Sequence, residues 1–166
     1  VLYDEPRPGV ARVTLNRPEK RNAQNMQMTY DLNSAFDFAV QQPHIKVIVL
    51  AAVGDHFSSG HDLSGDGSKT WRDFPILGTW ANFDQPGAEG RYAREMEIYL
   101  EITERWRNIS KLMIAQVQGK CVTGGLMLEL LLKKNLSSIA VQKSVTSNAR
   151  AVLILIRNCR EKKRVN

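Results

Sequence analysis

Two glycine-containing turns, each placed directly after an apolar run of strand length, constrain this chain most. The run 47–53 (VIVLAAV) leads into 56–63 (HFSSGHDL), and the run 113–117 (MIAQV) leads into 119–126 (GKCVTGGL). An apolar run rich in β-branched residues, followed by glycine and small polar residues, predicts a buried strand that ends in a tight turn. Such turns leave backbone N–H groups unpaired, and two of them at neighbouring strand ends can direct two donors at one oxygen atom. An oxyanion hole has that requirement.

Three segments resemble the motifs of one known superfamily. The segment 57–63 resembles the F-x-x-G-x-D-[IL] turn of the crotonase superfamily, the enoyl-CoA hydratase/isomerase fold. The segment 119–125 resembles its G-x(4)-G-G element, and 15–23 (LNRPEKRNA) resembles its L-N-R-P-x-x-x-N-A signature. The resemblance covers residues 1–128 and stops there. It implies an α/β fold, a crotonase-like (ClpP/crotonase) spiral of strand-strand-helix turns, in truncated form.

The hydrophobic pattern predicts a strand, helix, strand unit before the first turn. Residues 10–15 and 46–53 have strand patterns, and the helix between them begins near Asn25, with Asn25 or Asn22 as its cap. A right-handed crossover with parallel pairing is expected for such a unit. One face of this helix carries regularly spaced apolar residues: Met28, Leu32, Ala35, Phe36 and Ala39.

A long loop and a second helix are expected between the two turns. Residues 64–87 are rich in Gly, Asp, Ser and Pro and contain four scattered aromatic residues, Trp71, Phe74, Trp80 and Phe83. Loops of this length often cover a functional site, and the resemblance implies a lid over an acyl pocket; the alternative is that the aromatics only anchor the loop. A helical face then follows, ending near Asn108: Tyr92, Met96, Tyr99, Thr103 and Trp106.

Charge divides the chain at the point where the resemblance ends. Of the formal net charge of +6, residues 129–166 supply +7, from nine Lys/Arg and two Glu, and the first 128 residues supply −1. We predict a crotonase-like N-terminal core over 1–128. Residues 129–166 form a basic tail of unclear homology, which is either part of the same single domain or aberrant. A charged solvated end explains this tail better than nucleic-acid binding, which would show steep salt dependence.

Composition and competing motifs narrow the class of protein. No run approaches the roughly 20 apolar residues of a membrane helix, and the first residues have no secretory signal pattern. Two cysteines, Cys121 and Cys159, have no disulfide or metal spacing, so a cytoplasmic or other reducing intracellular location is expected. His56 and His61 lack an H-E-x-x-H context for zinc, and around Ser58 the motif G-x-S-x-G would need glycine where His56 stands. Dinucleotide and P-loop fingerprints are also incomplete.

The resemblance implies a site for an acyl-CoA thioester. The backbone N–H groups of His61 and Gly124 are the expected oxyanion-hole donors, which would stabilise an enolate oxygen; the side chain of His61 is not required for that role. Arg17 and Lys20 are candidates for the phosphates of coenzyme A. No cofactor is expected apart from coenzyme A as part of the substrate, and no metal. The expected partners are this substrate and further copies of the chain in a trimer or hexamer, without a membrane. Further candidates for substrate binding lie in the same two turns: Ser59, Gly60, Asp62, Leu63 and Gly125.

The general acid/base residue is not found by resemblance. Hydratases of this family have a glutamate three residues after the oxyanion glycine, where this chain has Met127, and a second near the position of Ser147, in the unmatched tail. Glu129 lies two positions too late, about 200° around a helix. Three explanations remain: a carboxylate elsewhere, such as Asp62 or Asp66; an inactive acyl-CoA binder; or a truncated or frameshifted gene product in which 129–166 is not the natural continuation. We favour the last.

Overall fold

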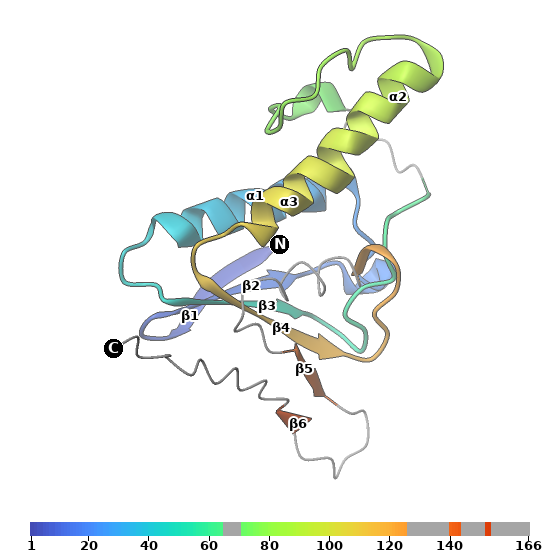
Figure 1. Ribbon diagram of the computed structural model, residues 1–166. Coiled ribbons are helices and arrows are strands. Elements are labelled where there is room, and N and C mark those ends of the chain that lie inside the picture. Colours follow the sequence, from blue (N-terminus) through green and yellow to red (C-terminus); the bar gives the residue numbers. More distant parts are fainter. Residues whose placement is uncertain (65–70, 126–139, 144–151, 154–166) are drawn as a thin grey trace, which may run out of the picture.

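The computed structural model of the chain describes residues 1–64, 71–125, 140–143 and 152–153. Its strands form one sheet in the order β1-β2-β3-β4-β5-β6 (Figure 1). Strands β2 to β5 are parallel, and β1 and β6 are antiparallel to their neighbours. The strands are β1 Leu2–Arg7, β2 Val10–Leu15, β3 Val47–Ala52, β4 Leu112–Gln118, β5 Ala140–Lys143 and β6 Val152–Leu153.

Two helical crossovers connect the parallel strands. Helix α1 (Met26–Gln41) joins β2 to β3, and a continuous helical segment made of α2 (Gly87–Glu95), η3 (Met96–Glu101) and α3 (Ile102–Arg107) leads into β4. Figure 1 shows α1 and α3 on the same side of the sheet. The predicted strand, helix, strand unit with parallel pairing is confirmed, because β2 and β3 pair in parallel along their whole length. Two short 3₁₀ turns complete the described elements: η1 Pro18–Lys20 and η2 Trp71–Asp73.

Asn25 and Asn22 have different structural roles at the start of α1. The side chain of Asn25 caps the helix by accepting a hydrogen bond from the N–H of Met28 at 3.0 Å. Asn22 is fully buried, and its amide donates to the carbonyl oxygens of Val53 and His56, each at 2.9 Å. The structure thus selects Asn25 as the cap and makes Asn22 the link between the loop after β2 and the loop after β3.

The core lies between the helices and one face of the sheet. Alternate residues of the central strands are buried on this face, as period-two patterning requires, and they pack against α1 and α3. Phe36 of α1 meets Trp106 of α3 edge to face, with ring centroids 5.4 Å apart. The indole N–H of Trp106 donates to Asn33 at 3.1 Å, which leaves this polar group satisfied. The strand residues of the core are Ala11, Val13, Leu15, Ile48, Leu50, Met113, Ala115 and Val117.

A π-helical segment in η3 changes the buried face of the second helix. The sequence pattern placed Tyr92 on the buried face, but its side chain is 57% exposed, whereas Glu97 is 1% and Ile98 8% exposed. A π-turn inserts one residue relative to an α-helical turn. The α-helical spacing therefore fits the residues of α3, up to Trp106, but is out of register for the residues that precede η3. The predicted face is therefore wrong at Tyr92.

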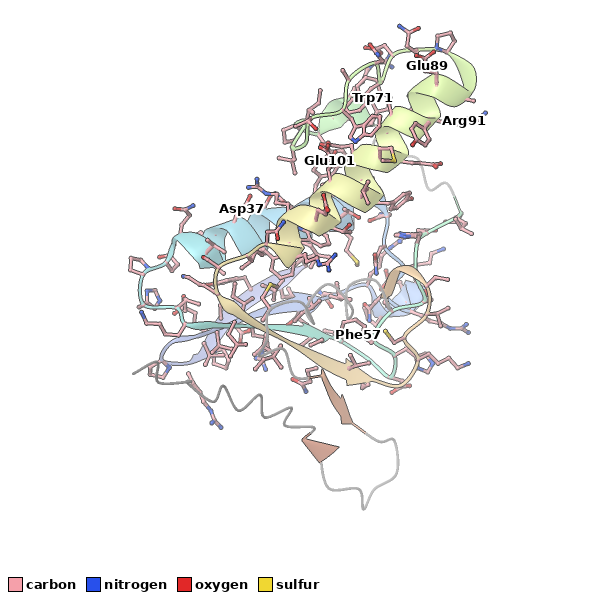
Figure 2. The ribbon with its side chains drawn as sticks, viewed as in Figure 1. Asp37, Phe57, Trp71, Glu89, Arg91 and Glu101 are labelled. Atoms are coloured by element: carbon pink, nitrogen blue, oxygen red, sulfur yellow. The ribbon has the colours of Figure 1, made fainter. Side chains whose placement is uncertain are left out.

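The loop between the two turns is anchored by aromatic packing and by two carboxylates. Phe74 stacks on Tyr30 of α1 with centroids 4.4 Å apart and an interplanar angle of 7°. The buried carboxylate of Glu97 accepts from the N–H groups of Leu77 (2.5 Å) and Gly78 (2.9 Å). Glu101, one helical turn later, accepts from the hydroxyl of Thr79 at 2.5 Å. Figure 2 shows Glu101 on the helix at the side where the Trp71 segment lies. The loop packs on its own chain, and its role as a lid stays a prediction.

Two short strands, β5 and β6, come from the predicted basic tail. β5 pairs in parallel with β4, and β6 pairs with β5. The proposed boundary at residue 128 and the homology of the tail stay predictions, because most of the tail lies outside the described residues. Within the part of the chain that the structure describes, no helix has the length and apolar character needed to cross a membrane.

Candidate active site

The two glycine turns lie side by side because β3 and β4 continue to pair beyond their ends. The N–H of Val122 donates to the carbonyl of Ser58 at 3.0 Å, and the N–H of Ser58 donates to the carbonyl of Lys120 at 3.3 Å. These two bonds form a parallel bridge between Ser58 and Cys121. Phe57, fully buried, fixes the turn to the core beneath it, where Figure 2 labels it close to the sheet.

Glycine is required where the turns touch. Gly60 has φ +98°, a conformation that residues with a side chain rarely adopt, and a Cβ there would lie 3.4 Å from the nitrogen of Gly124 and 3.1 Å from the carbonyl oxygen of Val122. A Cβ on Gly125 would lie 2.9 Å from the Cβ of Ser58. The two motifs found in the sequence are therefore in direct contact, although more than sixty residues separate them.

Among the described residues, the backbone pattern leaves the N–H groups of His61 and Gly124 without a partner. Gln24 pairs with His61 in a parallel bridge, in which the N–H of Gln24 donates to the carbonyl of Gly60 (2.8 Å) and the N–H of Asp62 donates to the carbonyl of Gln24 (2.9 Å). This pattern turns the N–H of His61 away from Gln24. In the hydrogen bonds between described residues, neither His61 nor Gly124 uses its backbone N–H as a donor.

A small cavity lies beside these two residues. Its volume is about 10 Å³, close to the minimum that one water molecule requires. The imidazole of His61 lies directly over Gly124, since a Cβ built on that glycine would be 2.7–3.0 Å from ring atoms of His61. On its other side the imidazole contacts the ring of Tyr99, with centroids 4.2 Å apart. The lining residues are Gln24, Thr29, His61, Ile98, Tyr99, Thr103, Trp106 and Gly124.

Burial shifts the pKa values of the two titratable residues that line the cavity in opposite directions. Desolvation lowers the pKa of the His61 imidazole below its usual value, because it penalises the charged form. Desolvation, and then the charge of Glu95, raises the pKa of the Tyr99 hydroxyl. At neutral pH, His61 is thus a neutral imidazole and Tyr99 a neutral phenol.

Arg17 and Asp62, both predicted site residues, bind each other. The guanidinium of Arg17 donates to the Asp62 carboxylate and, at 3.1 Å, to the carbonyl of Ala23, and its side chain is 14% exposed. Asp62 also accepts from the hydroxyl (2.5 Å) and the N–H (2.9 Å) of Ser64. The Ser64 hydroxyl and the Arg17 guanidinium hold the pKa of the Asp62 carboxyl well below its usual range. Asp62 is therefore a poor proton acceptor, and Arg17 is engaged in this structure.

The other predicted residues lie at the surface near the turns. Lys20 is exposed, and its carbonyl accepts from the hydroxyl of Ser59 at 3.4 Å. Leu63 is 93% exposed. A second cleft, of about 240 Å³, opens at the carboxyl ends of β2 and β3, and its lining cation is Arg21 rather than Arg17 or Lys20. The lining residues are Pro18, Arg21, Asn22, Val53, Gly54, Asp55 and His56.

Sequence reasoning missed the residues that complete the cavity opposite the turns. The helical spacing placed Tyr99 and Trp106 on one face of the predicted second helix, but nothing in the sequence indicated that they lie near His61. No sequence pattern pointed to Gln24 and Thr29. Residues that entered the sequence argument but lie outside the described part of the chain include Asp66, Met127, Glu129, Ser147 and Cys159.

The parallel sheet with two glycine turns at adjacent strand ends defines the class of protein as an α/β protein of the crotonase fold. Residues 5–75 match the family described as enoyl-CoA hydratase/isomerase. A solved structure of a probable enoyl-CoA hydratase from Mycobacterium smegmatis superposes with a TM-score of 0.64 at 34% identity, over 86% of this chain and 50% of that one. Over the matched segment, this chain belongs to the crotonase superfamily.

Two curated relatives support the same assignment. The chain is 40% identical over 125 residues to a Mycobacterium tuberculosis protein named as enoyl-CoA hydratase EchA13, which covers 72% of this chain and 39% of the relative. It is 30% identical over 124 residues to the mevalonyl-coenzyme A hydratase sidH of Aspergillus fumigatus, over 75% of this chain and 39% of the relative. The chain thus spans about two fifths of the length of these relatives and about half of the solved structure.

Proposed function

We propose that this chain is an acyl-CoA-binding enzyme of the enoyl-CoA hydratase/isomerase kind, in which the N–H groups of His61 and Gly124 bind the thioester oxygen. The observation that carries the proposal is the contact between the two turns, with both amides left without a described partner. Adding or removing a proton at C2 of a thioester develops negative charge on the carbonyl oxygen. Two fixed donors stabilise that charge by about 3 kcal/mol each.

Binding of an acyl group requires the cavity to open. A space of about 10 Å³ does not hold even a short acyl chain. The imidazole of His61 and the ring of Tyr99 occupy the volume next to Gly124, so these side chains move first. Tyr99 belongs to the π-helical segment η3, and such segments interrupt the regular helix hydrogen-bond pattern. We place the motion that admits the acyl group in this helix and in the loop that it carries.

The phosphates of coenzyme A have a candidate place next to the turns. The 240 Å³ cleft is formed by the loops after β2 and β3, where ligands of open α/β sheets bind. Arg21 lines it, and exposed Lys20 lies in the same loop. Arg17 supports this loop through Asp62 and so contributes to phosphate binding by positioning rather than by contact.

Titration calorimetry with butyryl-CoA and a hydration assay with crotonyl-CoA test the proposal. We expect saturable binding of the thioester that is weaker for free coenzyme A, and turnover of the enoyl thioester. Replacing the backbone amide of Gly124 by an ester removes one N–H and no side chain, and we expect turnover to fall about 100-fold. The same replacement at exposed Ser110 is the control. A chain that neither binds an acyl-CoA nor hydrates crotonyl-CoA contradicts the proposal.

A second candidate function is acyl-CoA binding without turnover. It is favoured by Met127, which stands where the family's first glutamate is expected and cannot carry a proton. Binding of butyryl-CoA without hydration, and the appearance of hydration in the Met127→Glu variant, would select this function. Hydration by the unaltered chain eliminates it.

A further inference from the structure

Among the described residues that line the cavity, His61 is the one whose side chain has a buried polar atom without a hydrogen-bond partner. Across the described residues, the buried side-chain atoms without a hydrogen-bond partner are Nδ1 of His61 and Oε1 of Gln27, and Gln27 does not line the cavity. A buried polar atom without a partner costs about 1–3 kcal/mol, and a function that uses the atom is one reason for a fold to retain it.

Three carboxylates near the site, among the described residues, are committed to other bonds. Asp62 accepts from Arg17 and Ser64, and its low pKa makes it a weak base. Glu97 and Glu101, the acidic residues of η3 that hold the loop, accept from backbone and hydroxyl groups of residues 77–79. None of these three carboxylates lines the cavity.

Two titratable groups remain among the described residues of the cavity wall, and only one is suited to accept a proton. Tyr99, which faces the imidazole from η3, keeps its hydroxyl proton at neutral pH. The other wall residues carry no charge: Gln24, Thr29, Ile98, Thr103, Trp106 and Gly124. The imidazole is neutral at neutral pH, so one of its ring nitrogens holds a free electron pair.

The position of the His61 imidazole also suits a base. The imidazole lies over Gly124, whose amide is one proposed donor to the thioester oxygen, and it belongs to His61, whose amide is the other. The ring moves aside to admit the acyl group, but it stays attached to the residue whose amide binds the oxygen, so it remains within reach of C2, which is two bonds from that oxygen.

We propose that the imidazole of His61 is the general base of this site and takes a proton from C2 of the bound acyl thioester; this inference rests on the function proposed above. The Nδ1 electron pair forms the new N–H bond, the C2–H electron pair becomes the double bond to the carbonyl carbon, and the carbonyl electron pair moves to the oxygen between the two amides. Return of a proton from the imidazolium to C2 restores the thioester. The step needs no oxidant, reductant or further reactant.

Exchange of the C2 hydrogens of butyryl-CoA in D₂O, followed by mass spectrometry, tests this role separately from hydration. We expect the unaltered chain to incorporate deuterium, and His61→Gln to lose at least about 100-fold in exchange rate while its affinity for butyryl-CoA in calorimetry is kept. His44→Gln is the matched control, since His44 is a surface residue paired with Glu5 at 2.9 Å. Circular dichroism establishes that the variants fold.

Two further readouts separate a base from a structural role. The exchange rate should fall as the pH decreases through the pKa of His61, which lies below the usual 6.5, and this limb should be absent in His61→Gln. Free imidazole should restore part of the exchange in His61→Ala, and His61→Asn serves if His61→Gln does not fold.

Three results overturn the inference. Exchange by His61→Gln within about threefold of the unaltered chain, at equal affinity, removes His61 as the base. Binding of butyryl-CoA without any exchange by the unaltered chain does the same. In both cases the proposed thioester site survives. Failure of the unaltered chain to bind any acyl-CoA overturns both proposals together.

Discussion

Arg17 and Asp62 form an ion pair that joins two of the three sequence motifs of this chain. Arg17 follows β2 in the segment 15–23, and Asp62 ends the turn after β3. The pair is well shielded, with side-chain exposures of 14% and 7%. The link fixes the turn that carries His61 against the loop that lines the 240 Å³ cleft. An apparent binding motif and an apparent catalytic motif are thus also one structural unit.

Removing the charge of Asp62 should destabilise the chain. Asp62→Asn removes the carboxylate that pairs with the part-buried guanidinium of Arg17, and we expect a loss of about 1–3 kcal/mol in the free energy of unfolding at pH 7, measured by urea denaturation. Asp4→Asn, which disrupts the exposed pair with Arg12, is the control and should have a smaller effect. Equal effects of the two substitutions would contradict the assigned role.

The Arg17–Asp62 ion pair also predicts how the stability of the chain changes as the pH falls. The folded-state pKa of Asp62 lies below that of the unfolded chain, so its contribution to stability is complete above the unfolded pKa of about 3.9 and is lost as the pH falls toward the folded value. The stability difference between the unaltered chain and Asp62→Asn should therefore be constant from pH 7 to about pH 5 and shrink below about pH 4. Urea denaturation at stepped pH measures it, and a difference that grows in acid would be inconsistent with this sign.

Glu97 should hold the loop closed on the helix. Glu97→Ala leaves the N–H groups of Leu77 and Gly78 without their acceptor, and we expect faster proteolysis within 71–87 together with a loss of about 1–3 kcal/mol in stability. Glu104→Ala, an exposed change on α3, is the control. Limited proteolysis followed by mass spectrometry locates the cuts. Unchanged cleavage in Glu97→Ala would show that the aromatic contacts and Glu101 anchor the loop without Glu97.

Phe57 should be the main anchor of the first turn. Its ring is fully buried, and we expect Phe57→Ala to cost about 3–5 kcal/mol in the free energy of unfolding, as large-to-small core changes do. Phe38→Ala, at a side chain that is 53% exposed, should cost much less. Phe57→Leu should lie between them. A cost below that of Phe38→Ala would mean that the turn is held by its backbone bonds alone.

Gly124 should tolerate no side chain. In Gly124→Ala the new Cβ would meet the imidazole of His61 at 2.7–3.0 Å, so the ring must shift, and we expect weaker binding of butyryl-CoA by about tenfold or more. Gly87→Ala is the matched control. Nothing lies within 4 Å of its Cβ, so its φ of +72° affects stability but not binding. Equal affinity in Gly124→Ala and the unaltered chain would argue against a site at this glycine.

The sequence by itself determined strands β2, β3 and β4, helix α1 and the two turns, because each rests on local rules. Alternation gives strands, apolar spacing gives a helix face, and glycine permits the positive φ of Gly60. The assignment of the matched segment to the crotonase superfamily also followed from motifs that could be read along the chain.

Only the tertiary structure decided what surrounds those turns. The π-turn in η3 left Tyr92 exposed, and packing brought Tyr99 against His61, a contact that helical spacing alone does not specify. Arg17 forms an ion pair with Asp62, and Arg21 is the cation that lines the 240 Å³ cleft. These contacts depend on how separate elements pack, and burial then sets the charge state of each group. The backbone conformation of the strands, of α1 and of the two turns depends on local sequence and was predictable. Desolvation and ion pairing act between residues far apart in the sequence and were not predictable.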